Sequence, residues 1–329
     1  MEVKDLFDQF KTKRILVVGD VMIDAYLRGK VSRVSPEAPV PIVNLTKTED
    51  RLGGAANVAL NIAALGAIPI LCAVIGADRG GNLFSDLLDK NGMSTEALVK
   101  SPDRQTTIKT RVIGNNQHLL RIDEEDLVPI SVEEELALIG RISEMLRNGL
   151  DAIILEDYNK GVLTPRVITE TIALAKAYNV PVTVDPKKDN FFAYKGVTLF
   201  KPNLKELKEG VGIHFDLSRG TIDFERAVHE LEKQLENKIT FVTLSEHGVF
   251  IKEGEAKNYI PAHIRNIADV SGAGDTVIAV ATLCLTTGLP SKDIADIANL
   301  SGGLVCEVSG VAPIDPELLM EEIENLKDA

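Results

Sequence analysis

The sequence predicts an α/β fold in which a doubly wound, mostly parallel sheet carries helices on both faces. Short apolar segments that suit buried parallel strands alternate along the chain with amphipathic or small-residue segments that suit helices. A run of such strand–helix units implies connections that return across both faces of one sheet. Two β-rich segments interrupt the alternation, and they predict a small β lid that projects from the sheet.

The first half of the chain contains two expected strands and two expected helices. Residues 14–20 form an apolar run that ends in turn chemistry, as a buried parallel strand does. A small-residue helix is expected over 55–65 and a second strand over 68–76. Ser131 and Glu134 have the spacing of a capping box, so a long amphipathic helix should begin there and end near Asn148 and Gly149.

The second half continues the same pattern. Thr164 and Pro165 suit the N-cap and first position of a helix. Two packed helices are expected near the C-terminal end, over 272–287 and 292–308. The expected strands of this half lie over 151–157, 181–185, 198–203 and 240–245.

The β lid is expected from these two segments, the second of which is a hairpin. Residues 40–45 follow a polar, proline-containing loop, and residues 106–113 and 118–122 flank a turn at 114–116 in the manner of a hairpin. Because no linker or repeat divides the chain, we expect one domain over 1–329, with a lid built from roughly 20–50 and 103–125. Lid strands leave an open edge and an apolar face, which predicts a homodimer in which two lids pack together.

Composition limits the function classes. The 329 residues are 45% hydrophobic and carry a net charge of −13, which argues against non-specific binding to nucleic acid or to an anionic membrane. Residues 1–14 have no apolar region of the kind that secretion signals carry, and the longest apolar run, 277–285, is too short to span a bilayer. The three cysteines lack metal spacing and suit buried thiols in a reducing compartment, so a cytoplasmic protein is expected.

Residues 269–276 (DVSGAGDT) precede an apolar helix and form the strongest candidate site. Glycines at a helix start let unpaired N–H groups approach an anion, and the helix dipole adds positive potential. Asp275 at such a place can take a proton from an attacking hydroxyl while the amides hold a phosphoryl group. The alternative is a glycine-rich turn with Asp275 as an ordinary helix-start carboxylate.

A second glycine motif lies early in the chain, at 52–57 (LGGAAN). A double glycine at a helix entrance can bring backbone against a sugar, and Asn57 offers paired donor and acceptor groups. The alternative is a tight turn into a close-packed helix. Neither a dinucleotide-binding fingerprint nor a phosphate-binding P-loop occurs in the sequence, so an NAD-dependent dehydrogenase is not expected.

The two motifs, in this order, resemble the ribokinase-like (phosphofructokinase-B type) sugar kinases over residues 14–313. The resemblance implies transfer of the γ-phosphoryl group of Mg²⁺·ATP to a sugar hydroxyl, with Asp275 as the base. Met22 stands where ribose kinases have an asparagine, which argues against ribose, and Ser271 replaces a threonine found in many members.

The resemblance also implies a role for each matching residue. The anion hole corresponds to Gly272, Ala273 and Gly274. The sugar side corresponds to Asp20, Asp24, Gly53, Gly54 and Asn57. The ATP side corresponds to Lys187, Asn203, Glu206, Ser245, Gly248, Gly272, Gly274 and Asn299. Glu206 would support Mg²⁺ through water, and Asp269 is a candidate for a monovalent cation site that would take K⁺.

Four further stretches resemble the kinase domain of ADP-heptose synthesis, which phosphorylates D-glycero-β-D-manno-heptose 7-phosphate on its C1 hydroxyl. They are 19–22 (GDVM), 33–41 (RVSPEAPVP), 157–161 (DYNKG) and 185–187 (DPK). Bifunctional members carry a C-terminal nucleotidyltransferase; the chain ends at Ala329, which predicts the stand-alone kinase form. The open alternatives are a kinase for another sugar or sugar phosphate, such as a fructose phosphate, and a non-catalytic sugar or nucleotide sensor on the same fold.

Basic residues at expected lid and loop positions agree with a phosphorylated sugar. A substrate phosphate needs a clamp of arginine or lysine side chains, although such residues are also common as solvated surface charges. The sequence does not decide which of them would hold the sugar phosphate and which the ATP phosphates. The candidates are Arg33, Lys109, Arg111, Arg121, Lys160 and Lys187.

Overall fold

The structure, a computed structural model that describes residues 2–263, 265–308 and 310–328, is built on an eight-stranded sheet. Six neighbouring strands run parallel, and the last two form an antiparallel edge. This arrangement is the mostly parallel sheet that the sequence predicts. In spatial order the strands are β14 (Ala256–Ile260), β13 (Val249–Glu253), β12 (Ile239–Thr243), β11 (Leu199–Phe200), β10 (Val182–Asp185), β9 (Ala152–Glu156), β1 (Arg14–Gly19) and β4 (Ile68–Cys72).

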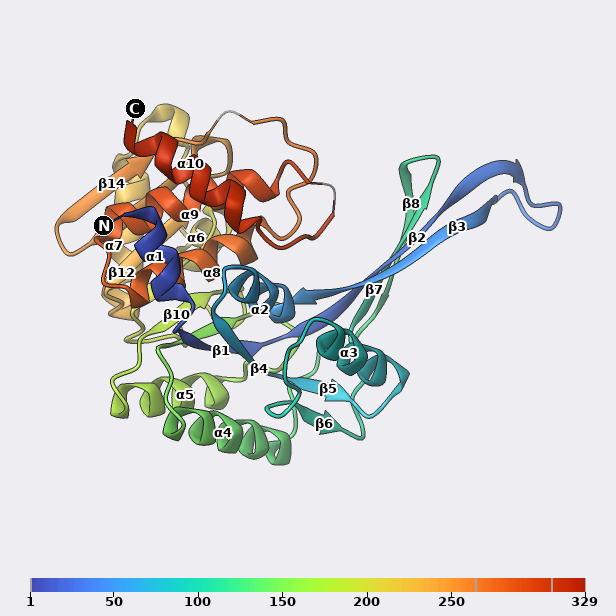
Figure 1. Ribbon diagram of the computed structural model, residues 1–329, viewed down its shortest axis with the longest axis horizontal. Helices are drawn as coiled ribbons and strands as arrows, with labels where there is room; N and C mark the ends of the chain where they lie inside the picture. Colours follow the sequence, from blue (N-terminus) through green and yellow to red (C-terminus); the bar gives the residue numbers. More distant parts are fainter. Residues whose placement is uncertain (1, 264, 309, 329) are drawn as a thin grey trace.

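Helices cover both faces of this sheet and enclose two apolar cores (Figure 1). Along β1, Ile15 and Val17 belong to one core and Leu16 and Val18 to the other, as expected for a strand buried on both faces. The first core contains α1 (Val3–Phe10), α2 (Ala55–Ala64), α3 (Arg79–Lys90), α8 (Ala273–Thr286), α9 (Ser291–Val305) and α10 (Pro316–Asp328). The second contains α4 (Val132–Arg147), α5 (Pro165–Ala177), α6 (Leu204–Val211) and α7 (Ile222–Leu235).

The residues predicted to begin two helices do so in the structure. Ser131 and Glu134 make a reciprocal capping box at the start of α4, and Thr164 caps α5 with Pro165 in its first turn. The expectation of a single strand over 68–76 is wrong, because the strand is interrupted at Ala73. Its second part, β5 (Val74–Gly76), leaves the main sheet and pairs with β6 (Val99–Ser101).

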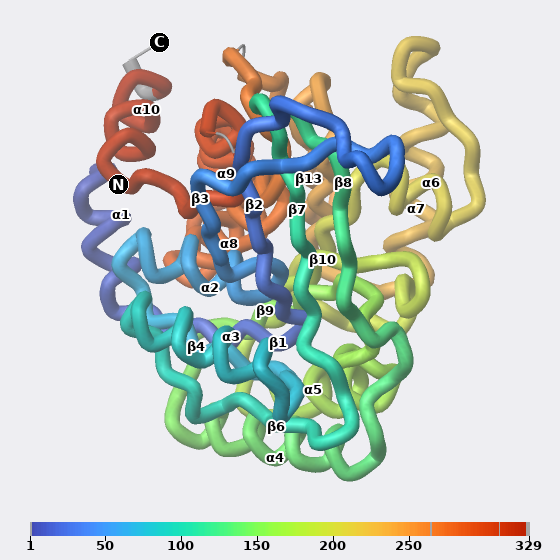
Figure 2. The backbone as a smooth tube through the Cα atoms, turned by 90° about the vertical axis from the view of Figure 1, so that its right-hand side faces the viewer, coloured from blue at the N-terminus to red at the C-terminus, as the bar shows by residue number. Residues whose placement is uncertain are grey.

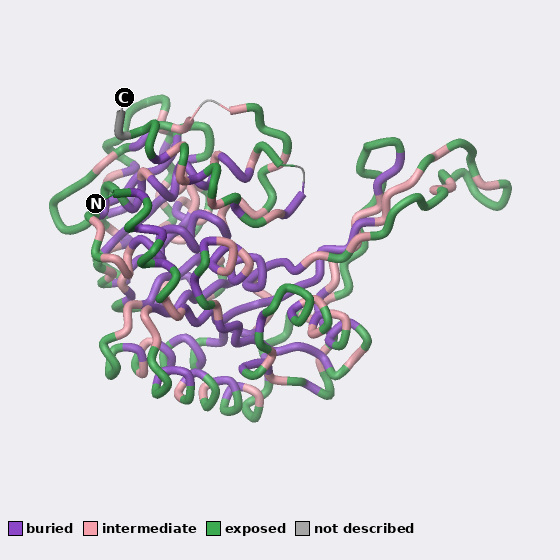
Figure 3. The backbone as a smooth tube through the Cα atoms, in the orientation of Figure 1, coloured by how far each residue is buried: buried purple, intermediate pink, exposed green. Residues whose placement is uncertain are grey.

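A second, four-stranded sheet projects from the body as a lid (Figures 1 and 2). Its order is β3 (Pro41–Gly54), β2 (Val21–Val34), β7 (Ile108–Gly114) and β8 (Gln117–Glu124). Only Asp20 separates β1 of the body from β2 of the lid. The far half of the lid is largely exposed, whereas its base is buried against the body (Figure 3).

None of the helices in the described ranges has both the length and the apolar character needed to cross a lipid bilayer.

Candidate active site

The start of α8 places Asp275 at the centre of the candidate site. Gly272 is the N-cap residue and has a φ of 83°, a left-handed conformation that favours glycine. A Cβ atom at this position would lie 2.9 Å from Nδ2 of Asn57, so the loop passes close to a residue that contacts Asp275. First-turn N–H groups of a helix lack intrahelical acceptors, which leaves donors for an anion beside Asp275.

Two donors hold the Asp275 carboxylate, which is only 4% exposed. The Tyr158 hydroxyl donates to Oδ1 at 2.6 Å, and Asn57 Nδ2 donates to Oδ2 at 2.7 Å. Burial raises the pKa of Asp275 to about 6, and the Asp185 carboxylate adds to the rise while the two hydrogen bonds oppose it. Near pH 7 the group is therefore mostly ionised, yet it retains enough affinity for a proton to act as a base.

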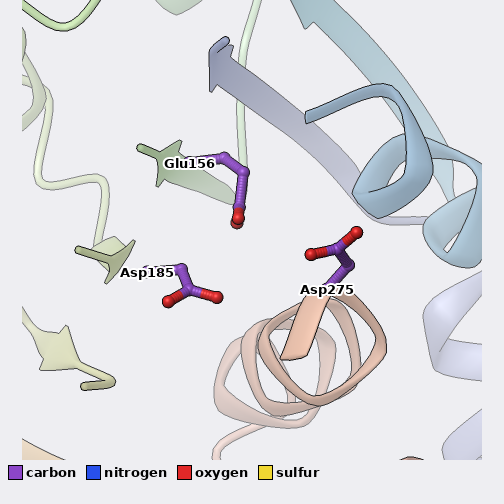
Figure 4. A group of neighbouring side chains, drawn as sticks. All are labelled: Glu156, Asp185 and Asp275. Carbon is purple, nitrogen blue, oxygen red and sulfur yellow. The ribbon is translucent and has the colours of Figure 1, made fainter. Parts of the chain in front are cut away.

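Two further buried carboxylates face Asp275 (Figure 4). Glu156 ends β9 and Asp185 ends β10, and the two residues are paired in register, so adjacent parallel strands bring them together. One oxygen of each of Glu156, Asp185 and Asp275 lies within 4.8 Å of the others. Carboxylate oxygens that converge in this way suit a hard divalent cation such as Mg²⁺.

Glu156 lacks compensation for its burial. It is 0% exposed, and neither side-chain oxygen has a hydrogen-bond partner within the described residues. Burial raises the pKa of Glu156 well above its ordinary value, and Asp185 and Asp275 raise it further. Asp185, by contrast, pairs with the buried Lys201 at 2.8 Å. An unpartnered buried carboxyl group calls for a ligand, and a cation satisfies it.

A cavity of about 700 Å³ opens beside this cluster on the side where nucleotide binding is expected. Of the expected ATP-side residues, Lys187, Asn203, Ser245, Gly272 and Gly274 line it. Four lysine side chains also line the cavity: Lys187, Lys201, Lys205 and Lys208.

The other expected ATP-side residues support this wall. Asn203 and Glu206 form a capping box that begins α6, and Glu206 also pairs with Lys187 at 2.7 Å. Although burial lowers the pKa of Lys187, the Asp185 and Glu206 carboxylates outweigh it and raise the pKa above its usual range. Gly248 has a φ of 89° in the turn between β12 and β13. Asn299 donates to the Pro261 carbonyl at 2.9 Å.

The expected sugar-side residues meet where β3 enters α2. A Cβ atom on Gly53 would lie 2.2 Å from Oδ2 of Asp24, and Gly54 has a φ of 60°, so neither position accepts a side chain easily. Asp24 is 4% exposed and is paired with Arg111. Gly53 therefore leaves room for the Asp24 carboxylate at the lid base, and Gly54 for the Asp20 carbonyl.

Asp20, expected on the sugar side, holds a loop in the structure. Its carboxylate accepts N–H groups from Tyr158 at 2.8 Å, Lys160 at 3.1 Å and Val162 at 3.1 Å. The side chain is 1% exposed. Asp20 thus positions the loop that carries Tyr158.

The remaining expected residues are spread over the lid and its base. Arg33 is exposed on β2, nine residues beyond Asp24, which is about 30 Å along a strand. This distance separates it from the sugar side of the same chain. Arg121 pairs with Asp123 at 2.9 Å and Lys160 with Glu125 at 2.8 Å. Asp269 accepts the N–H groups of Ser271 and Gly310, both at 3.0 Å.

Sequence reasoning missed four residues of the site: Glu156, Tyr158, Asp185 and Lys201. The signal for the two acids was their position at the carboxyl ends of adjacent strands, where open α/β sheets bind ligands. Tyr158 lies in the DYNKG stretch, but its contact with Asp275 joins positions 117 residues apart. The local sequence pattern around Tyr158 cannot predict such a long-range contact.

A model of the family described as "pfkB family carbohydrate kinase" matches residues 12–318. The chain belongs to this family. It is 40% identical over 317 residues, 96% of its length, to the Bifunctional protein HldE of Methylobacillus flagellatus, and 41% identical over 298 residues, 91% of its length, to that of Wolinella succinogenes. It spans 64% and 62% of these two relatives, just under two thirds of each.

Solved structures of other pfkB-like kinases share the fold. Phosphofructokinase-2 from Escherichia coli in complex with potassium superposes with a TM-score of 0.78 at 18% identity, covering 97% of this chain and 100% of that one. Arabidopsis thaliana ribokinase complexed with ribose and ATP gives 0.72 at 17% identity, covering 94% and 99%. The predicted ribokinase-like fold and carbohydrate kinase family are therefore confirmed.

Proposed function

We propose that this pfkB-family kinase phosphorylates D-glycero-β-D-manno-heptose 7-phosphate on the C1 hydroxyl, giving the 1,7-bisphosphate for ADP-heptose and lipopolysaccharide core synthesis. The observation that carries the proposal is the buried Asp275, held by Tyr158 and Asn57 at the start of α8. The heptose-kinase-like stretches at 33–41 and 157–161 and the HldE relatives support this substrate.

The reaction would proceed by direct transfer. Asp275 takes the proton of the sugar hydroxyl, whose oxygen bonds to the γ-phosphorus of ATP as the bond to the bridging oxygen of ADP breaks. The first-turn amides of α8 face the negative charge that develops on the transferring group. Tyr158 and Asn57 keep the carboxylate oriented toward the hydroxyl. Because the phosphoryl group passes directly to the sugar oxygen, no covalent enzyme intermediate is formed.

The unpartnered oxygens of Glu156 fit Mg²⁺, and Glu156 and Asp185 would hold it near the phosphates. The ion supplies charge neutralisation on the phosphate oxygens when bound. Glu206, engaged with Lys187 and the α6 cap, would act only through water. Glu156→Gln should weaken Mn²⁺ binding, followed by electron paramagnetic resonance without ATP; unchanged binding would exclude Glu156 as a ligand.

Asp269 is our proposed K⁺ ligand. Its Oδ1 and Oδ2 each accept a backbone N–H group, a carboxylate oxygen can accept more than one partner, and a structural neighbour is a potassium complex. Replacing K⁺ by tetramethylammonium should lower kcat in the wild type and change little in Asp269→Asn. Equal activity of the wild type in both salts would remove the K⁺ site.

A homodimer through the lids, in the cytoplasm, completes the proposal. Leu27, Val112 and Leu120 lie side by side in the strand register and therefore share one face of the lid. Ile122 and Leu45 extend the exposed apolar surface, with 46% and 53% exposure. Such a surface suits a second lid. The three free cysteines suit a reducing compartment.

The test is a coupled ADP-release assay on a panel of sugars with and without phosphate. We expect heptose 7-phosphate to give the highest kcat/KM. A fructose phosphate as the best substrate would favour the alternative of another sugar phosphate kinase, and no ADP release with any acceptor would favour a sensor. Phosphorus NMR of the product would distinguish a C1 phosphate from other positions.

A further inference from the structure

A second, smaller cavity of about 190 Å³ lies between the lid and the body beside the candidate active site. Tyr26, Arg28, Asn116 and His118 line it from the lid, and Asp269 and Gly310 from the body. Gly310 is followed by Val311, which packs near Gly272 and accepts a hydrogen bond from Arg51 at 2.6 Å. The cavity therefore borders the site from the side of the lid.

Strand alternation turns Arg28 toward the same side as the sugar-side Asp24. Successive side chains of a strand point to opposite faces, so Asp24, Tyr26 and Arg28 of β2 share one face of the lid. Arg28 is four residues beyond Asp24, about 13 Å along the strand. A long side chain at this position can reach the far end of an acceptor whose middle lies at Asp24.

Arg28 differs from most cations of this face in its partners. Five of them contact a carboxylate: Lys47 and Arg51 contact Glu49, Lys109 contacts Glu125, Arg111 contacts Asp24, and Arg121 contacts Asp123. Lys30, two residues further out on β2, is exposed and contacts no carboxylate in the described residues. Arg28 has no carboxylate partner in the described part of the chain, and its guanidinium carbon lies 5.3 Å from the centre of the Tyr26 ring, which Arg51 and Arg111 also approach. The side chain is half-buried, so this positive charge is available to an anion.

We propose that Arg28, with His118 and Asn116, binds the phosphate group of the sugar-phosphate substrate in this cavity. The inference rests on the proposed function in one respect, that the acceptor carries a phosphate. A guanidinium binds phosphate oxygens through two parallel N–H groups, and its contact with the Tyr26 ring places it beside the cavity. Asp269 shares the cavity as an anion, and each of its oxygens accepts a backbone N–H group, which disperses part of its negative charge.

This assignment differs from the clamp expected at Arg33 or Lys160. Arg33 is exposed further out on the hairpin, and Lys160 already pairs with Glu125 at 2.8 Å. A cation that must first release a carboxylate gains less from a phosphate than one without a partner. Arg28 thus has the smaller competing interaction.

Equilibrium binding tests the inference without requiring turnover. Titration calorimetry without ATP would measure the affinity of heptose 7-phosphate and of the unphosphorylated heptose for the wild type, Arg28→Ala and Arg28→Lys. Arg28→Ala should weaken binding of the phosphorylated sugar about 10- to 100-fold, the usual effect of losing charge-assisted hydrogen bonds. Its effect on the unphosphorylated sugar should stay within about twofold, and lysine should restore part of the affinity.

Lys30→Ala is the matched control, because Lys30 lies two residues further along β2 and is exposed. It should bind both sugars as the wild type does. An equal loss for both sugars in Arg28→Ala, or no loss for either, would overturn the inference, as would a wild type that binds neither. A wild type that binds heptose 7-phosphate through Arg28 but transfers no phosphoryl group would instead contradict the proposed function alone.

Discussion

Asp275 combines two requirements that oppose one another. Burial disfavours the ionised carboxylate and so increases its affinity for a proton, whereas the donors Tyr158 and Asn57 favour the ionised form. The resulting pKa of about 6 keeps the base ionised near neutral pH. Removal of either donor should therefore change the pH dependence of the reaction as well as its rate.

Replacement of the base tests its role directly. Asp275→Asn preserves the shape of the side chain but cannot accept the proton, so kcat should fall by roughly 10²- to 10⁴-fold with little change in sugar binding. Steady-state kinetics and calorimetry measure the two quantities. Asp103→Asn, at an exposed aspartate, serves as the control. Wild-type turnover in Asp275→Asn would remove Asp275 from the mechanism.

The pH profile tests the hydrogen bond from Tyr158. In the wild type, kcat/KM should fall as the pH drops through about 6, because Asp275 becomes protonated. Tyr158→Phe removes a donor that stabilises the ionised carboxylate, so its pKa should rise and the acid limb should move to higher pH. Profiles from pH 5 to 9 would show the shift. An acid limb that stays in place or moves to lower pH would contradict this role.

At the scale of elements, the junction of β3 and α2 depends on the absence of a side chain. Gly53→Ala should push its methyl group into the Asp24 carboxylate, 2.2 Å away, and into Met22 Cγ, 2.9 Å away. We expect KM for the sugar to rise and the protein to lose about 1–3 kcal/mol of stability, as overpacked cores do.

Gly140→Ala is the matched control for this substitution. Gly140 lies in α4, and a Cβ atom there would have no atom within 4 Å. Alanine should leave KM unchanged and stabilise the protein by about 0.5–1 kcal/mol through helix propensity. Thermal unfolding measures the stability of both variants, and steady-state kinetics measures their KM for the sugar. A Gly53→Ala enzyme with wild-type KM would show that the junction tolerates a side chain.

The parallel strands of the body, part of β3 and much of β7 and β8 of the lid were predictable, whereas β2 of the lid was not, for a physical reason. A parallel strand buried on both faces is a continuous apolar run, as in β1, which the sequence reveals directly. β2 alternates Asp24, Tyr26 and Arg28 with apolar neighbours, and such a two-faced lid strand resembles a polar loop. The glycine motifs were also readable, but the approach of Glu156, Asp185 and Asp275 depends on sheet register and helix packing.

For the whole molecule, we expect the apolar face of the lid to direct the proposed dimerisation. Light scattering at micromolar concentration should give twice the chain mass of 35.7 kDa. Leu120→Asp places a charge on a side chain that is 58% exposed on this face, so it should shift the protein toward the monomer. Val132→Asp, at a 57% exposed position on α4, should leave the mass unchanged. A monomeric wild type would refute the lid dimer.

A single residue connects β1 of the body to β2 of the lid, so a movement of the lid would reach the candidate active site. Asp20 is that residue, and its carboxylate holds the loop whose Tyr158 donates to Asp275. A tilt of β2 would displace Asp20, and Tyr158 would move with the loop. The position of the lid and the proton affinity of Asp275 would then be thermodynamically coupled. A lid that tilts away from the body would leave a poorly aligned base, and water would then be a poor substitute acceptor for the ATP phosphoryl group.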